Sequence, residues 1–142
     1  MRAGRPVLLV PDGVDALGVD RMVVAWKDTR EARRAVSDAL PLLKLATEVS
    51  VVEIATEDDL ASAELRCNDL VAWLRRHKVK AAAMPMLSTG DDATTLRDFA
   101  EDQRADLVIA GAYGHSRLRE WALGGVTRDF LLRANRCSLV SH

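Results

Sequence analysis

The sequence predicts an α/β domain in which strands and helices alternate and a parallel sheet is covered by helices on both faces. Short apolar runs bounded by turn residues are typical of buried strands, and helical apolar periodicity fills the segments between them. Such alternation favours a parallel sheet, because each crossover places a helix on one of its faces. The predicted strands are Arg21–Trp26, Val49–Ile54, Val79–Leu87 with a bend near Pro85, Asp106–Gly111 and Cys137–Ser141.

Helices are expected between these strands. The first is predicted to begin after Thr29, whose hydroxyl suits an N-cap, and to run to about Thr47. Pro41 lies inside it and predicts a kink or an early end. The other three helices are expected to begin at Ser62, to span Asp91–Gln103 and to include Val126–Ala134.

Composition limits the class of protein. The 142 residues suit one domain, with 49% apolar residues and 20 basic against 21 acidic residues, for a net charge of −1. This balance favours neither a nucleic-acid partner nor a membrane, and no signal peptide is visible. Cys67 and Cys137 form no CxxC pattern and are expected to be reduced thiols of a cytoplasmic protein. His77, His115 and His142 lack ligand spacing, so no metal site is predicted.

A glycine-rich segment follows the fourth predicted strand. Gly111 ends the apolar run, Gly114 follows it, and the pair Gly124–Gly125 precedes the last predicted helix. Glycine permits positive φ and close approach of a ligand, and a helix that begins after glycine offers free N–H groups to an anion. The segment is interpreted as an anion-binding loop, in which Gly111 or Gly114 is expected to have positive φ.

The same glycines resemble a family motif. The spacing Gly111-x2-Gly114-x9-Gly124 is similar to the G-x2-G-x9-G-[ST] motif of the universal stress protein family. The residues around these glycines, the C-terminal segment Ser138–His142 and the segment Met22–Val36 also resemble the sequences of bacterial family members. The likeness covers residues 21–142. It implies a flavodoxin-like (adenine-nucleotide α-hydrolase-like) fold, with a five-stranded parallel sheet of order 3-2-1-4-5.

This strand order implies a ligand crevice. Ligands of such sheets bind where the strand order reverses, at the carboxyl ends of the strands. In the family order, the loops after the first and fourth strands meet there, and the resemblance implies ATP or AMP as the candidate ligand. The candidate binding residues are Ala25, Trp26, Lys27, Asp28, Gly111, Gly114, His115, Arg117, Gly124, Gly125 and Thr127.

Two positions depart from the family pattern. Gly125 stands where nucleotide-binding members have Ser or Thr, so a phosphate-binding hydroxyl is lost. Thr127 could replace it or could merely cap the helix. Lys27 stands where the family often has an acid, and it either favours phosphate or is a solvated loop lysine. Asp28 could supply the acid if the loop shifts by one residue. Trp26 is more typical of packing than of base stacking.

The resemblance implies a non-catalytic module of stress response that acts through association and through a regulatory adenine nucleotide. The alternative is an enzyme that slowly hydrolyses ATP on the Gly111–Thr127 loop. Arg117 could pair with a phosphate, whereas His115 has no visible nucleophile or orienting partner. No catalytic residue is predicted, and nucleotide binding is expected to be weak or absent because of Gly125 and Lys27.

The N-terminal 20 residues lie outside the expected domain of residues 21–142. Pro6–Val10 resembles the last strand of a universal stress protein domain, so the chain resembles the second domain of a bacterial tandem protein with a preceding strand attached. A truncated protein, a shortened gene and a natural single domain all fit. We expect Pro6–Val10 to pair antiparallel with Cys137–Ser141 as an extra edge strand, because an open edge seeks a partner. The pairing could be within one chain, as a pseudo-dimer, or swapped between chains of a homodimer. The alternative is a disordered tail.

Overall fold

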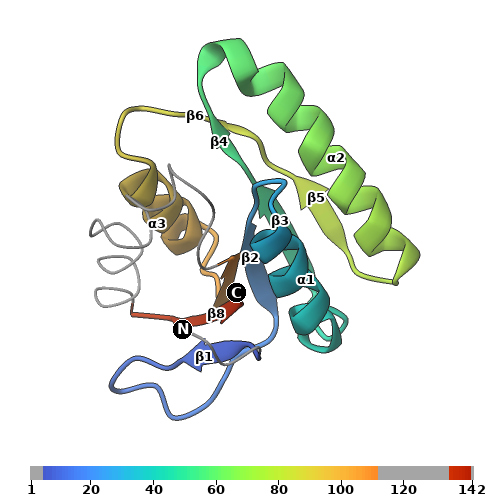
Figure 1. Cartoon of the computed structure of the whole chain (residues 1–142). Helices are drawn as coiled ribbons and strands as arrows, with labels where there is room; N and C mark the ends of the chain where they lie inside the picture. Colours follow the sequence, from blue (N-terminus) through green and yellow to red (C-terminus); the bar gives the residue numbers. More distant parts are fainter. Residues whose placement is uncertain (1–4, 112–134, 142) are drawn as a thin grey trace.

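The computed structural model describes residues 5–111 and 135–141. Six of its strands form one sheet in the spatial order β1-β8-β7-β2-β3-β5 (Figure 1). All pairs are parallel except β1 with β8. The strands are β1 (Val7–Leu9), β2 (Arg21–Ala25), β3 (Glu48–Val52), β5 (Ala81–Ala83), β7 (Leu107–Gly111) and β8 (Cys137–Ser141). The five parallel strands therefore have the expected order 3-2-1-4-5, and the predicted fold class is confirmed.

Helices cover both faces of the sheet. Helices α1 (Arg30–Leu43) and α2 (Leu60–Arg76) lie on one face, and α3 (Asp92–Asp102) lies on the other (Figure 1). Successive side chains of a strand point to opposite faces, so β2 sends Met22 and Val24 to the cluster under α1 and α2 and Val23 to the cluster under α3. None of the helices in the described part of the chain is long and apolar enough to cross a membrane. The predicted fourth helix falls outside the described residues.

Helix α1 begins as its sequence predicts. Thr29 is the N-cap, and its Oγ1 accepts a hydrogen bond from the backbone N–H of Ala32 at 3.2 Å. Pro41 lies within the last turn, and the helix ends at Leu43 rather than near Thr47. Since proline has no N–H to donate to the preceding turn, this early end is the expected consequence.

Helix α2 begins earlier than predicted. A 3₁₀ turn, η1 (Glu57–Asp59), leads directly into the helix at Leu60, whereas a start at Ser62 was expected. Asp59 occupies the N-cap position without making a side-chain capping bond, because its carboxylate binds Arg66 instead. A capping pattern covers only the first turn of a helix, whereas Arg66 lies about two turns beyond Asp59. The earlier start of α2 was therefore not predicted.

Two predicted strands are each broken into two pieces. Glu53 separates β3 from β4 (Ile54–Ala55), and Met84 and Pro85 separate β5 from β6 (Met86–Leu87). The short pieces β4 and β6 pair with each other in a separate two-stranded sheet. The second break was anticipated as a bend near Pro85, whereas the sequence was interpreted as one continuous strand through Glu53.

The N-terminal strand pairs as predicted. Within the chain, β1 runs antiparallel to β8, with Val7 opposite Val140 and Leu9 opposite Ser138. Pro6 and Pro11, which lack N–H groups, flank this short strand, and both features discourage further pairing at a sheet edge.

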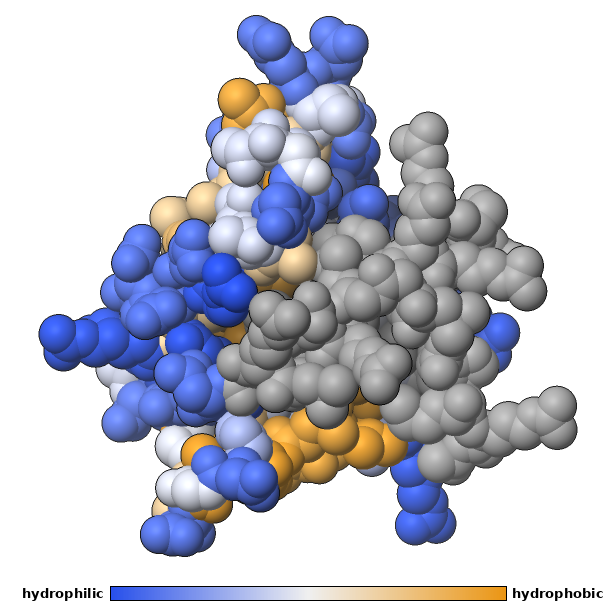
Figure 2. Space-filling view, turned by 90° about the vertical axis from the view of Figure 1, so that its left-hand side faces the viewer, coloured by the Kyte–Doolittle hydropathy of each residue, from blue (hydrophilic) through white to orange (hydrophobic). Residues whose placement is uncertain are grey.

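Apolar side chains of β1 and its flank remain exposed. Leu8 is 42% exposed and Val10 is 55% exposed. In Figure 2 an apolar strip lies at the bottom of the face, at the height at which β1 lies in Figure 1. Contiguous exposed apolar surface of this kind can mark an interaction site even where backbone pairing is discouraged.

Candidate functional site

A pocket of about 40 Å³ lies at the carboxyl ends of the strands, where β2 and β7 meet and the strand order reverses. Its walls come from β2, β3, β4, β7 and from the first turn of α1, with one residue from α3. The lining residues are Ala25, Trp26, Lys27, Thr29, Glu31, Ala32, Val52, Ile54, Leu96, Ala110 and Gly111. The structure thus brings four of the predicted site residues together: Ala25, Trp26, Lys27 and Gly111.

Gly111 is required here by sterics and not by its φ angle. Gly111 does not have positive φ, so the expectation that Gly111 or Gly114 does now depends on Gly114, which lies outside the described residues. A Cβ atom at Gly111 would lie 2.5 Å from the backbone nitrogen of Ala32 and 2.7 Å from the carbonyl carbon of Glu31. The last residue of β7 therefore touches the first turn of α1, and glycine permits this approach.

The loop between β2 and α1 forms the rim of the pocket. The N–H of Thr29 donates to the carbonyl of Lys27 at 2.7 Å, which tightens the turn into the helix. Lys27 is exposed and lines the pocket. Asp28 is not among the lining residues; its carboxylate forms an exposed ion pair with Arg33 at 2.7 Å.

Glu31 is the acidic residue that lines the pocket, and sequence analysis did not identify it. Its position in the first turn after the Thr29 cap was the available signal, because residues of that turn face the strand end that precedes the helix.

Trp26 contributes both to the pocket and to the core. It is 7% exposed and belongs to the apolar cluster under α1 and α2, where Trp73 packs against the same cluster. Its Nε1 is buried without a hydrogen-bond partner among the described residues. The residue is therefore held by packing, while its position at the end of β2 places it in the pocket wall.

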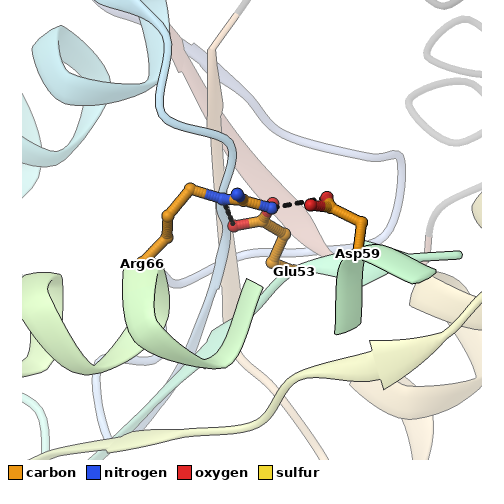
Figure 3. Close-up of polar contacts among 3 residues, drawn as sticks. All are labelled: Glu53, Asp59 and Arg66. Carbon is orange, nitrogen blue, oxygen red and sulfur yellow. Dashed lines mark hydrogen bonds and ion pairs between the residues drawn. The ribbon is translucent and has the colours of Figure 1, made fainter. Parts of the chain in front are cut away.

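A buried carboxylate lies directly behind the pocket wall. Glu53, at the break between β3 and β4, is 4% exposed and is the one charged residue among the buried residues of the described chain. Arg66 of α2 donates to it through Nη2 at 2.6 Å and through Nε at 2.9 and 3.2 Å. The same guanidinium donates to Asp59 at 2.7 Å, so it lies between two carboxylates (Figure 3).

The electrostatics of this cluster follow from those contacts. Hydrogen bonds from Arg66 to Glu53, and secondarily to Asp59, raise the pKa of the guanidinium above its usual range. The cluster therefore holds one fixed positive charge between two acids. Sequence analysis missed it, although a lone acid within the apolar run from Val49 to Ala55 was a visible signal.

Both cysteines are buried free thiols. Burial raises the pKa of Cys67 to about 11 and also raises the pKa of Cys137. Because the thiolate is the reactive form, neither thiol is suited to nucleophilic chemistry at neutral pH. Among residues 5–111 and 135–141, no group of His, Cys, Asp or Glu side chains is arranged to hold a metal ion.

The remaining predicted site residues lie outside the described residues. They are Gly114, His115, Arg117, Gly124, Gly125 and Thr127. What the structure describes is the part of the site formed by the ends of the strands and the first turn of α1.

Several solved structures with this architecture are universal stress proteins. One from Archaeoglobus fulgidus in complex with dAMP is 19% identical, with a TM-score of 0.69 over 89% of this chain and 100% of that chain. One in complex with cAMP is 18% identical, with a TM-score of 0.70 over 87% and 96%. Another, from Archaeoglobus fulgidus DSM 4304, is 17% identical, with a TM-score of 0.74 over 96% of this chain and 49% of that chain.

At these identities the structural likeness shows the fold alone. No curated protein matches the chain in sequence. The family model for "Universal stress protein family" matches residues 18–140, which include every element from β2 to β7 and most of β8. This chain therefore belongs to the universal stress protein family.

Proposed function

We propose that this chain is a non-catalytic module of stress response, that it binds an adenine nucleotide weakly in the pocket between β2 and β7, and that this binding regulates its associations. The observation that carries the proposal is the convergence of two separate candidate loops on one pocket. Ala25, Trp26 and Lys27 come from the first loop, and Gly111 begins the second.

The chemistry of the described walls suits such a ligand. Val52, Ile54 and Leu96 offer apolar contact to a base, and Lys27 adds a positive charge at the rim. The first turn of α1 adds the positive end of a helix dipole. The neighbours solved with dAMP and with cAMP support an adenine nucleotide as the class of ligand.

The glycine-rich segment is proposed to contact the phosphates. Gly114, Gly124 and Gly125 would offer backbone N–H groups, and Arg117 and His115 would add side-chain donors to the same loop. Thr127 would donate a hydroxyl in place of the one that Gly125 lacks. One lost hydroxyl and the lysine at position 27, in place of an acid, are the reasons for expecting weak affinity.

The same two departures argue against the alternative of slow ATP hydrolysis. An ATPase needs an intact phosphate loop, an acid for the metal ion and a means to position water. Gly125 lacks the loop hydroxyl and Lys27 stands in place of the family's acid, and both departures weigh against catalysis; the acid that does line the pocket, Glu31, lies in the first turn of α1.

Calorimetric titration with AMP, ATP and GTP tests the proposal. We expect weak binding of AMP and ATP, without a sub-micromolar dissociation constant, and GTP serves as the comparison nucleotide. Thr127→Ala should weaken binding by about 0.5–1.5 kcal/mol, the net value of one hydrogen bond. Thr89→Ala, in the turn before α3, is the matched control and should bind as the parent does. Sub-micromolar affinity for ATP would contradict the weak site, and absence of heat with millimolar AMP or ATP would remove the nucleotide from the proposal.

We also propose that the module associates through the edge formed by β1 and β8 and that it acts in the cytoplasm. The intrachain pairing of β1 with β8 supports a pseudo-dimer arrangement, and a swapped homodimer uses the same register with β1 donated by a second copy. Removing residues 1–11 exposes the edge of β8, so we expect the apparent mass in light scattering to change or the protein to lose solubility. Unchanged elution and unchanged melting would rule out this role for β1.

A further inference from the structure

We propose that the ion pair between Glu53 and Arg66 positions the wall of the pocket formed by Val52 and Ile54. This inference rests on the proposed function for the class of ligand, but its geometric content concerns the ligand-free protein. Glu53 is a positioning residue in this proposal, since it does not itself line the pocket.

Glu53 occupies the break between two strands of the pocket wall. It separates β3 from β4, and the residues on either side of it, Val52 and Ile54, both line the pocket. Alternate residues of an extended chain point to opposite faces. When Val52 and Ile54 face the pocket on the α3 side, the side chain of Glu53 must point toward α2, where Arg66 meets it (Figure 3).

Two backbone hydrogen bonds hold the chain at this point. The carbonyl of Val52 accepts from the N–H of Trp26 at 2.7 Å, and the carbonyl of Glu53 accepts from the N–H of Met86 at 2.9 Å. The segment thus leaves the main sheet and joins the small β4–β6 sheet within two residues. At this point the chain passes from the hydrogen bonds of the main sheet to those of the β4–β6 sheet. The side chain of Glu53 adds a contact with a third element, α2.

The energetics of the pair also favour a positioning role. This ion pair is weak evidence for stability, because desolvation of the buried Glu53 carboxylate offsets much of its attraction to Arg66, whose side chain is 30% exposed. An apolar pair of similar volume would fill the same space between α2 and the strand break. An apolar pair has no preferred orientation. The Arg66 guanidinium, in contrast, makes a two-pronged contact with Glu53 and a further bond to Asp59, so it fixes the relative position of these groups. The cluster therefore specifies one position of the strand break relative to α2.

The test compares three variants of the full chain with the parent protein. Arg66→Lys keeps the charge but loses the two-pronged contact, and Glu53→Gln keeps the shape but loses the charge. The double variant Glu53→Leu with Arg66→Met replaces the pair by apolar side chains. Arg97→Lys, which alters an exposed ion pair with Asp98 on α3, is the matched control.

The first readout is the position of the wall without ligand. In methyl NMR spectra of the ligand-free protein, we expect the resonances of Val52 and Ile54 to shift in all three variants and to stay in place in Arg97→Lys. Unchanged Val52 and Ile54 resonances in Arg66→Lys and Glu53→Gln would overturn the proposal. This readout needs no nucleotide. If the parent protein binds no nucleotide, the proposed function is refuted, but the spectra still test whether the ion pair positions Val52 and Ile54.

The second readout separates position from stability. We expect the affinity for AMP to fall roughly 2- to 30-fold in the three variants, the range found when residues without ligand contact are changed. The double variant should melt at or above the temperature of the parent, while its affinity stays reduced. Parent-like affinity in the double variant would show that any filling of this space suffices, and the proposal would then be wrong.

Discussion

The two ends of the sheet are built differently. At the amino ends of the strands, helices α2 and α3 end with the same bond pattern, whereas at the carboxyl ends β3 and β5 are each interrupted and continue as the short strands β4 and β6. After α2, Lys78 adopts φ 63° and the N–H of Val79 donates to the carbonyl of Leu74. After α3, Arg104 adopts φ 51° and the N–H of Ala105 donates to the carbonyl of Ala100.

Both helix ends have the bond pattern of the Schellman motif, without its usual glycine. The residue after each left-handed position, Val79 or Ala105, is buried and leads into the next strand. The two helix ends at the amino end of the sheet therefore share one local hydrogen-bond pattern.

The carboxyl end is held by contacts between distant segments. Gly111 touches the first turn of α1, and Glu53 binds Arg66 thirteen residues along the chain. The amino end thus combines two repeated helix caps with the bonds from Asp106 to the start of β2, while the end that carries the pocket depends on the close approach at Gly111 and on the pair of Glu53 with Arg66. Substitutions at the two ends should differ accordingly.

The largest expected effect is that of Gly111→Ala. Its Cβ would lie 2.5 Å from the nitrogen of Ala32, so β7 and α1 must separate, and we expect the free energy of unfolding to fall by about 2–3 kcal/mol. Urea unfolding measures this change. The control is Gly90→Ala, where φ is +103° and no atom lies within 4 Å of the added Cβ. Backbone strain alone should cost about 1–2 kcal/mol there. A smaller loss at Gly111 than at Gly90 would refute the steric role of Gly111.

At the amino end, Asp106→Ala is expected to have the next largest effect. The Oδ2 atom of Asp106 accepts from the N–H groups of Asp20 and Arg21 at 3.1 and 3.0 Å, which holds the linker at the start of β2. We expect a loss of about 1–2 kcal/mol and faster hydrogen exchange of the Arg21 amide. Asp102→Ala, at the end of α3, is the control and should leave that exchange rate unchanged. Equal exchange in both variants would show that Asp106 does not hold the linker.

Thr29→Ala tests the cap beside the pocket. The hydroxyl satisfies the N–H of Ala32, and its loss should cost about 1 kcal/mol in thermal or urea unfolding. Thr29→Ser keeps the hydroxyl and should recover most of that loss. If serine and alanine destabilise the protein equally, the methyl group rather than the cap is what Thr29 contributes.

Local patterns predicted the features that local physics determines. The alternation of elements and the cap at Thr29 follow from periodicity and hydroxyl placement, whereas the pairing of β1 with β8 was predicted from the resemblance of Pro6–Val10 to the last strand of the family. Family order then predicted that the residues after β2 and β7 meet, and the pocket contains both. These predictions needed no knowledge of which side chains meet across the fold.

The errors share a different cause. The strand was predicted to continue through Glu53, and the second helix to begin at Ser62, because the sequence does not show that Arg66 binds both Glu53 and Asp59. At Gly111 the constraint is the approach of α1 rather than a positive φ, and the expectation that Gly111 or Gly114 has positive φ stays a prediction for Gly114, which lies outside the described residues. Each error concerns a contact between elements, which periodicity and spacing do not encode.

The smallest expected effect has the opposite sign and belongs to the amino end. Lys78 and Arg104 hold left-handed conformations that cost an L-residue about 1–2 kcal/mol, while glycine adopts them freely but has a more flexible unfolded chain. The difference predicts that Lys78→Gly and Arg104→Gly each raise the free energy of unfolding by about 0.5–1 kcal/mol. Lys80→Gly, two residues beyond the left-handed position, is the control and should lower it. Because the two motifs are far apart and share no partner, the two gains should add in the double variant. Destabilisation by both glycines would show that the long side chains of Lys78 and Arg104 contribute more than the relief of backbone strain, and the two ends of the sheet would then both depend on specific side chains.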